Sequence, residues 1–261
     1  MSRELIHLYG NLSIQSFGTI ITVGLLLFVW LVHRNPRRKA LMSSEQFSRA
    51  LLVGVIAGIV GGRLLYVAEE YHSMNSLFDV FRFWEGGFAI LGTIIAVLLA
   101  LAIYLKNKKI PLLPFFDLVA IYGPLLQSIS RLGCLAAGCC YGKACSSAWA
   151  VTYTDPNSIA PTHVPLHPTP LYSTIALFLL FLFMKFIAAR RLTVPGQLIT
   201  LYLLGASAVR FTVDFWRADR EFFSAPCLAH LSMHQWIALC IGTAALCAFI
   251  VLSIRDKQTQ S

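Results

Sequence analysis

Long apolar runs alternate with short polar segments over the whole chain. Each run is long enough to cross a hydrocarbon core of about 30 Å, which takes roughly 20 helical residues. The runs lie near 14–33, 48–69, 87–105, 115–137, 170–189, 196–213 and 234–254. They are continuous rather than alternating at every second residue, and a backbone in lipid must satisfy its own hydrogen bonds, so each run predicts a helix. The pattern predicts an all-α polytopic membrane protein with seven transmembrane helices.

The lysines and arginines between the runs predict the orientation of these helices. Basic clusters follow the first, third and fifth runs and recur in the tail, at Arg34, Arg37, Arg38, Lys39, Lys106, Lys108, Lys109, Arg190, Arg191, Arg255 and Lys257. Because such clusters stay on the cytoplasmic side, we expect the N-terminus outside and the C-terminus in the cytoplasm. We expect a single transmembrane domain over residues 1–261, with outward-facing loops at 70–86, 138–169 and 214–233.

The composition agrees with a membrane location and narrows the list of partners. The chain has 261 residues, of which 57% are hydrophobic and 13% charged, unlike a soluble globular domain. The net charge of +9 comes largely from the loop clusters, so it suits anionic lipid headgroups and gives no support to a nucleic-acid partner. Seven cysteines exclude a fully paired disulfide framework, and their spacing lacks repeated CxxC pairs. We therefore expect no metal and no cofactor.

Three arginines fall in the outward halves of apolar runs, at Arg63, Arg131 and Arg210. An ionisable group at that depth is costly unless it is paired or lines a wet cavity, so each marks a functional site. Carboxylates are few. Asp214 follows Arg210 by four residues and precedes Arg217 by three, so it can pair with one or both along a helix face. The remaining positive charge suits a phosphate, because a planar guanidinium gives bidentate contacts. The placement predicts an outward-opening phospholipid headgroup site.

A series of short motifs resembles, in order along the chain, the bacterial prolipoprotein diacylglyceryl transferases. The motifs are Gly62-Arg63-Leu64-Leu65-Tyr66, Trp84-Glu85-Gly86-Gly87, Arg131-Leu132-Gly133 with Gly138 and Gly142, His167-Pro168-Thr169, Pro195-Gly196-Gln197, the segment from Arg210 to Arg217 with Asp219, and Leu231-Ser232-Met233-His234-Gln235. The resemblance implies seven helices with an outward N-terminus, in the bacterial cell inner membrane. It also implies transfer of the diacylglyceryl group of phosphatidylglycerol to the thiol of a lipobox cysteine in a preprolipoprotein.

The resemblance also implies roles for particular residues. Arg131 and Arg210 are expected to be catalytic, at the headgroup and the leaving phosphate. The expected phosphatidylglycerol-binding set is Arg63, Tyr66, Arg131, Gly142, Arg210, Asp214 and Arg217. The attacking thiol belongs to the substrate, and the candidates to accept its proton are His167, Glu85 and a cysteine thiolate among Cys134, Cys139 and Cys140.

The chain departs from the family pattern at Leu91, where the family carries a histidine, and at Cys139, where it carries a glutamate. Two further interpretations follow from these departures. One is a non-catalytic or altered-specificity phospholipid-binding paralogue on the same fold. The other is a redox-active membrane protein that uses Cys139 and Cys140. In an oxidising compartment, a disulfide between this region and Cys227 is an alternative for the same cysteines.

Overall fold

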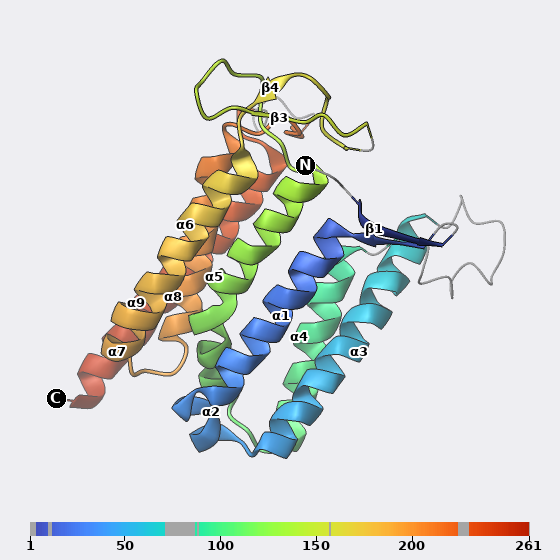
Figure 1. Ribbon diagram of the computed structural model, residues 1–261. Helices are drawn as coiled ribbons and strands as arrows, with labels where there is room; N and C mark the ends of the chain where they lie inside the picture. Colours follow the sequence, from blue (N-terminus) through green and yellow to red (C-terminus); the bar gives the residue numbers. More distant parts are fainter. Residues whose placement is uncertain are drawn as a thin grey trace. The chain divides into compact units, whose positions relative to one another are not determined.

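A computed structural model describes residues 4–9, 12–70, 87, 89–156, 158–223 and 230–260 (Figure 1). The backbone groups into two compact units, Met1–Val32 with Phe116–Ser261, and His33–Phe115. The first unit holds most of α1 (Ser16–Arg34) and α5 (Leu112–Ala137), together with α6 (Thr169–Phe183), α7 (Ala189–Arg191), α8 (Gln197–Asp214) and α9 (Met233–Gln260). The second unit holds α2 (Pro36–Leu41), α3 (Ser44–Glu69) and α4 (Ile90–Asn107).

Each predicted apolar run contains a helix, and the protein is a multi-pass membrane protein. Among the described residues, six helical segments are long and apolar enough to cross a membrane: α1, α3, α4, α5, the stretch Thr169–Arg191 and α9. The stretch Thr169–Arg191 joins α6 to α7 through a π-helical turn, η4 (Met184–Ala188). Helix α8 occupies the sixth predicted run but is not among those six, so the seventh span stays a prediction.

Four short strands accompany the helices, which the apolar pattern did not predict. Strand β1 (Glu4–Tyr9) pairs antiparallel with β2 (Leu12–Gln15), and β3 (Val151–Thr152) pairs antiparallel with β4 (Pro165–Leu166). Strands this short carry too few residues to show a period of two in the sequence. The loop that contains β3 and β4 lies at one end of α5 and α6 (Figure 1).

Helix α5 is the central helix of the first unit. Half of its membrane window is buried, against 17% to 22% in the other spans of that unit. It is approached closely by α1, because a Cβ on Gly24 would come within 2.8 Å of the Ile129 side chain. It is joined to α6 by the hydroxyl of Ser128, which donates to the carbonyl of Thr174 at 2.9 Å. Small and hydroxyl residues at such crossings let helices approach in lipid.

In the second unit, α3 and α4 cross at a pair of glycines. A Cβ on Gly61 would lie 2.7 Å from the carbonyl oxygen of Gly92, and a Cβ on Gly92 would lie 2.4 Å from that of Gly61. The hydroxyl of Thr93 donates across the same crossing to the carbonyl of Gly58 at 3.2 Å. Leu91 is 59% exposed. Thr93 thus joins the two helices, whereas Leu91 lies away from their contact.

The N-terminus of α8 is capped from a distant helix. The carboxylate of Asp117, which is buried in α5, accepts the backbone N–H of Gly196 at 2.6 Å and that of Ile199 at 2.8 Å. Gly196 has a φ of 98°, a conformation that favours glycine. The first N–H groups of a helix have no hydrogen-bond partner within the helix. A buried carboxylate at that end accepts hydrogen bonds from them, and its negative charge interacts favourably with the helix dipole. Asp117 therefore orients α8, which carries Arg210 and Asp214.

We predict that Asp117→Ala lowers the free energy of unfolding by about 3 kcal/mol, because two hydrogen bonds to a buried charged group are lost. Asp117→Asn, which keeps one side-chain acceptor, should cost less. Denaturation of the purified chain in detergent micelles measures both values. Glu45→Ala removes an exposed ion pair with Arg49 and serves as the control, with little expected change. Equal losses in all three variants would contradict the role of Asp117.

Candidate active site

Helix α5 ends in a left-handed turn that returns the chain towards the helix. Gly138 has a φ of 71°. The backbone N–H of Cys139 donates to the carbonyl of Cys134 at 3.1 Å, and that of Gly138 donates to the carbonyl of Leu135 at 3.4 Å. These are the two hydrogen bonds of a Schellman motif, in which side chains at the positions of Cys134 and Cys139 characteristically touch. The helix end itself therefore brings these two cysteines together.

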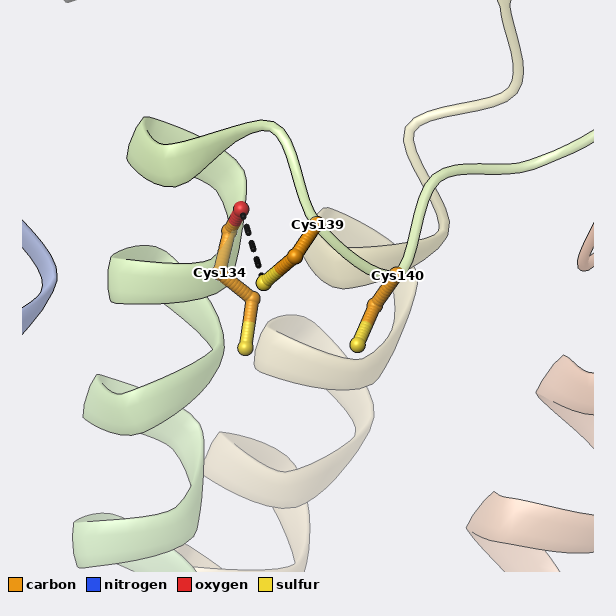
Figure 2. A group of neighbouring side chains, drawn as sticks. All are labelled: Cys134, Cys139 and Cys140. Carbon is orange, nitrogen blue, oxygen red and sulfur yellow. Dashed lines mark hydrogen bonds between the residues drawn. The ribbon is translucent and has the colours of Figure 1, made fainter. Parts of the chain in front are cut away.

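Three cysteine side chains meet at this turn. Figure 2 shows Cys134, Cys139 and Cys140 directed into the same space, and their Sγ atoms all lie within 4.8 Å of one another. We call these three residues the cysteine cluster. Cys140 has a φ of 59°, which is uncommon for a residue other than glycine. Cys134 is buried, whereas Cys139 and Cys140 are half-buried, so part of the cluster is exposed.

The two cysteines beyond the end of α5 differ in the direction in which the pKa of each thiol is shifted. Hydrogen bonds with Cys134 and Cys139, together with the positive charges of Arg217 and Arg131, lower the pKa of the Cys140 thiol below its usual value. Hydrogen bonds with Cys134 and Cys140 raise the pKa of Cys139. The Nη1 atom of Arg131 lies 3.7 Å from Cys140 Sγ and donates to it. The turn thus places the Cys140 sulfur within reach of the positive charges of Arg131 and Arg217.

Residues 141–144 run between two other backbone segments. Gly142 pairs antiparallel with Arg217, and Ala144 pairs antiparallel with Leu166. The N–H of Gly142 donates to the carbonyl of His167 at 3.0 Å. A Cβ on Gly142 would lie 2.6 Å from that same carbonyl oxygen and 2.8 Å from another backbone oxygen, on the opposite segment. Only glycine fits here, and the pairing holds Arg217 beside the end of α5.

Arg210 and Arg220 share the carboxylate of Asp214, whose side chain is 1% exposed. The Nη2 atom of Arg210 lies 3.5 Å from Asp214 Oδ1, and the Nε atom of Arg220 lies 3.4 Å from Oδ2. The hydroxyl of Ser232 donates to the same carboxylate. The Nη2 atom of Arg220 also donates to Gln235 Oε1 at 2.7 Å. This buried network ties the end of α8 to the start of α9.

Arg217 pairs with Asp219 rather than with Asp214. Its Nε atom donates to Asp219 Oδ1 at 2.7 Å, and its Nη2 atom donates to the other carboxylate oxygen. Burial acts to raise the pKa of Asp219, but the hydrogen bonds from Arg217 outweigh it and hold that pKa below its ordinary value. The sequence left open whether Asp214 pairs with Arg210, with Arg217 or with both, and in the structure it pairs with Arg210.

The guanidinium groups at this end of the first unit outnumber their carboxylate partners. Arg131 and Arg217 lie close enough to Arg210 for their charges to act on it. Together with Arg220, these are four guanidiniums against the two carboxylates that pair with them in the described part of the chain. A surplus of positive charge with planar donors suits an anion that has several oxygens, such as a phosphate ester.

His167 lies between β4 and α6, close to the same backbone segments. Its Nδ1 atom lies 3.0 Å from the hydroxyl of Tyr172, and the ring of Tyr172 meets that of Trp216 edge-on at 6.2 Å. The side chain of His167 is half-buried. The contact with Tyr172 through Nδ1 thus fixes the orientation of the imidazole.

The structure adds two residues that the sequence did not select for the site. Arg220 contacts Asp214, as described above, and lies over the ring of Phe222 at 4.8 Å. His234 is on the first turn of α9, and its Nδ1 atom is buried without a hydrogen bond within the described residues. Both lie in or beside a predicted outward loop, but only the fold brings them to the network around Arg210.

The remaining predicted site residues lie elsewhere or outside the described residues. Arg63 is buried in the second unit, where its Nη1 atom donates to the carbonyl of Gly87 at 3.0 Å and its guanidinium lies 5.3 Å from the centre of the Tyr66 ring. Glu85 and Cys227 lie outside the described residues. The proposed disulfide with Cys227 therefore stays a prediction.

Comparisons with known proteins give one family. A family model for prolipoprotein diacylglyceryl transferase matches residues 3–251. A Clostridium tetani protein named phosphatidylglycerol–prolipoprotein diacylglyceryl transferase is 33% identical, over 84% of this chain and 86% of its own length. A Clostridium perfringens protein with that name and the number 2 is 34% identical over 95% and 94%, and one from Dehalococcoides mccartyi is 35% identical over 95% and 93%. This chain therefore belongs to the prolipoprotein diacylglyceryl transferase family.

Proposed function

We propose that this protein transfers the diacylglyceryl group of phosphatidylglycerol to the lipobox cysteine thiol of a preprolipoprotein. The substrate thiolate attacks the glycerol carbon that bears the phosphate ester, a C–S bond forms, and glycerol phosphate leaves with the electron pair of the broken C–O bond. The observation that carries this proposal is the surplus of guanidinium groups around Arg131, Arg210 and Arg217. Negative charge grows on the leaving phosphate, and fixed cations stabilise it most where they are already oriented.

Arg131 and Arg210 are the groups that we assign to the phosphate. Arg131 emerges from the last turns of α5 and Arg210 from the last turns of α8. Asp214 orients Arg210 at 3.5 Å but is shared with Arg220, so Arg210 keeps donors for a ligand. Arg217, held by Asp219, completes the positive site. Gly142 contributes by letting the backbone segments approach.

The remaining assignments concern the headgroup and the proton of the thiol. In this proposal Arg63 and Tyr66 bind the lipid headgroup or the adjacent ester. Their cation–π contact holds the two side chains in position for this role. His167 and Glu85 are our candidates to accept the thiol proton, and the fixed imidazole of His167 supports the first of these.

The proposed topology places the site at the outer leaflet of the bacterial inner membrane. We propose seven spans, with α8 as the sixth, the N-terminus outside and the C-terminus in the cytoplasm. The basic residues between the helices support this orientation. Polar residues in α8, such as Gln197, Thr200 and Asp214, lower the mean hydropathy of this helix. They are buried against protein, which allows a membrane span to contain them. A preprolipoprotein and a lipid then reach one domain from the same side.

We predict that Arg131→Ala and Arg210→Ala each lower the transfer rate about a hundredfold or more, the loss typical of removing one preorganised donor at a developing anion. The purified protein is mixed with phosphatidylglycerol and a lipobox peptide, and the modified thiol is measured by mass spectrometry. Arg190→Ala is the matched control. Arg190 is exposed, and it lies at the end of the helical stretch Thr169–Arg191 that is farther along the chain from His167. Wild-type protein that binds phosphatidylglycerol but never modifies the peptide would favour the non-catalytic paralogue instead.

We predict that Gly142→Ala lowers the transfer rate at least about tenfold, because the new methyl group meets backbone oxygens on two segments that cannot both move away. Gly18→Ala is the control, since nothing lies within 4 Å of a Cβ at that position. The same peptide assay compares the two variants. Equal activity in both would show that the close pairing at Gly142 is not needed for the reaction.

A further inference from the structure

The cysteine cluster has no part in the scheme above, although the substrate group to be activated is itself a thiol. Cys134, Cys139 and Cys140 present three sulfur atoms, all within 4.8 Å of one another, beside the arginines of the site. The sequence predicted no metal because the cysteine spacing lacks repeated CxxC pairs. The Schellman turn after α5 brings the cysteines together through its backbone geometry, and their spacing in the sequence does not reveal this proximity.

The size of the cluster is close to that of a three-thiolate zinc site. An ion at the centre of a triangle with this side would lie at most about 2.8 Å from each sulfur, against about 2.3 Å for a Zn–S bond. Each sulfur must move about half an ångström, which a small rotation about χ1 provides. Successive side chains of an extended chain point to opposite sides, so the left-handed backbone at Cys140 is what allows neighbouring cysteines to share one ligand.

The charges around the cluster suit an anionic metal complex. Zinc with three thiolates carries a charge of about −1, and a fourth thiolate makes it about −2. Arg131 already donates to the sulfur of Cys140 at 3.7 Å, and Arg217 lies within range of the same sulfur. The two arginines would repel an uncoordinated metal ion, but they stabilise the negatively charged complex of the ion with its thiolates. Cys139 and Cys140 are half-buried rather than buried, which is compatible with the approach of a fourth ligand.

We propose that Cys134, Cys139 and Cys140 bind one thiophilic divalent cation, Zn²⁺, and that its open fourth position takes the substrate's lipobox thiol. This inference rests on the proposed transferase function. A thiol that coordinates zinc loses its proton, here to the acceptor proposed above, His167, and remains a thiolate. That thiolate attacks the glycerol carbon, the C–S bond forms as the C–O bond breaks, and the phosphate leaves towards Arg131 and Arg210. The oxidation state of the metal does not change, and no further reactant is needed.

Metal binding is tested with Co²⁺ as a spectroscopic probe in the full-length chain. The reduced, metal-free protein in detergent is titrated with Co²⁺ without oxygen. Thiolate-to-cobalt charge-transfer bands are expected to saturate at about one ion per chain, together with the visible bands of a tetrahedral ion, and Zn²⁺ should abolish them. Cys134→Ser, Cys139→Ser and Cys140→Ser should each weaken binding at least about tenfold. Elution as a monodisperse species shows that each variant is folded.

The matched control replaces cysteines outside the cluster. Cys145 lies beside Ser147, at 3.3 Å between Sγ and Oγ, and is not part of the cluster, while Cys240 and Cys247 are exposed on α9. A protein with all three changed to serine should bind Co²⁺ as the wild type does. Absence of the bands in wild-type protein, or their persistence in the cluster variants, overturns the proposal. Active protein isolated with a disulfide within the cluster also overturns it.

The role of the fourth position is tested with the substrate. A lipobox peptide is expected to shift the visible cobalt bands, whereas the same peptide with serine in place of its cysteine should not. Removal of metal should lower transfer at least about tenfold, and Zn²⁺ should restore it. Transfer at an unchanged rate by metal-free protein overturns this inference and leaves the proposed function standing. Metal binding without any transfer overturns the proposed function and the substrate role, and leaves the metal site.

Discussion

A guanidinium cannot lose its charge, and the arrangement of the first unit follows from the need to satisfy several of them at the end of apolar helices. Asp214 is divided between Arg210 and Arg220, and Asp219 is taken by Arg217. Each of these contacts requires a particular connection: α8 must end beside α9, and the segment after α8 must return to the end of α5. The arginines outnumber these carboxylates, and our proposal places a lipid phosphate among them.

Two structural devices hold that network in place, one at each end of the helices. Asp117 caps α8 from within α5 and fixes the direction of the helix that carries Arg210. At the other end, the close pairing around Gly142 joins the loop after α5 to the segment of Arg217 and to His167. Arg217, Asp219 and Arg220 lie on the short irregular segment after α8, and such segments keep a precise geometry only when rigid elements and backbone hydrogen bonds support them.

The cysteines take on a different meaning once their positions are known. Cys139 stands where the family pattern has a glutamate, and the sequence alone leaves a redox pair, a disulfide and a proton acceptor as alternatives. In the structure Cys139 joins Cys134 and Cys140 in a single group of sulfurs next to Arg131. Under the proposed function, a set of three thiols next to the site that receives a substrate thiol is better suited to binding a soft metal and sharing it than to a single proton transfer.

The sequence by itself determined the membrane class and the location of the helices, because apolar length is read directly from residue order. It also predicted a role for Arg131 and Arg210, as charges within apolar runs. It also carried the motifs that identify the family. Only the tertiary structure decided which charged side chains pair with each other. Arg217 pairs with Asp219, two residues away, and not with Asp214, three residues away. The cysteine cluster was likewise decided there, because it depends on backbone turns at Gly138 and Cys140 that bring separate positions together and leave no periodic signal in the sequence.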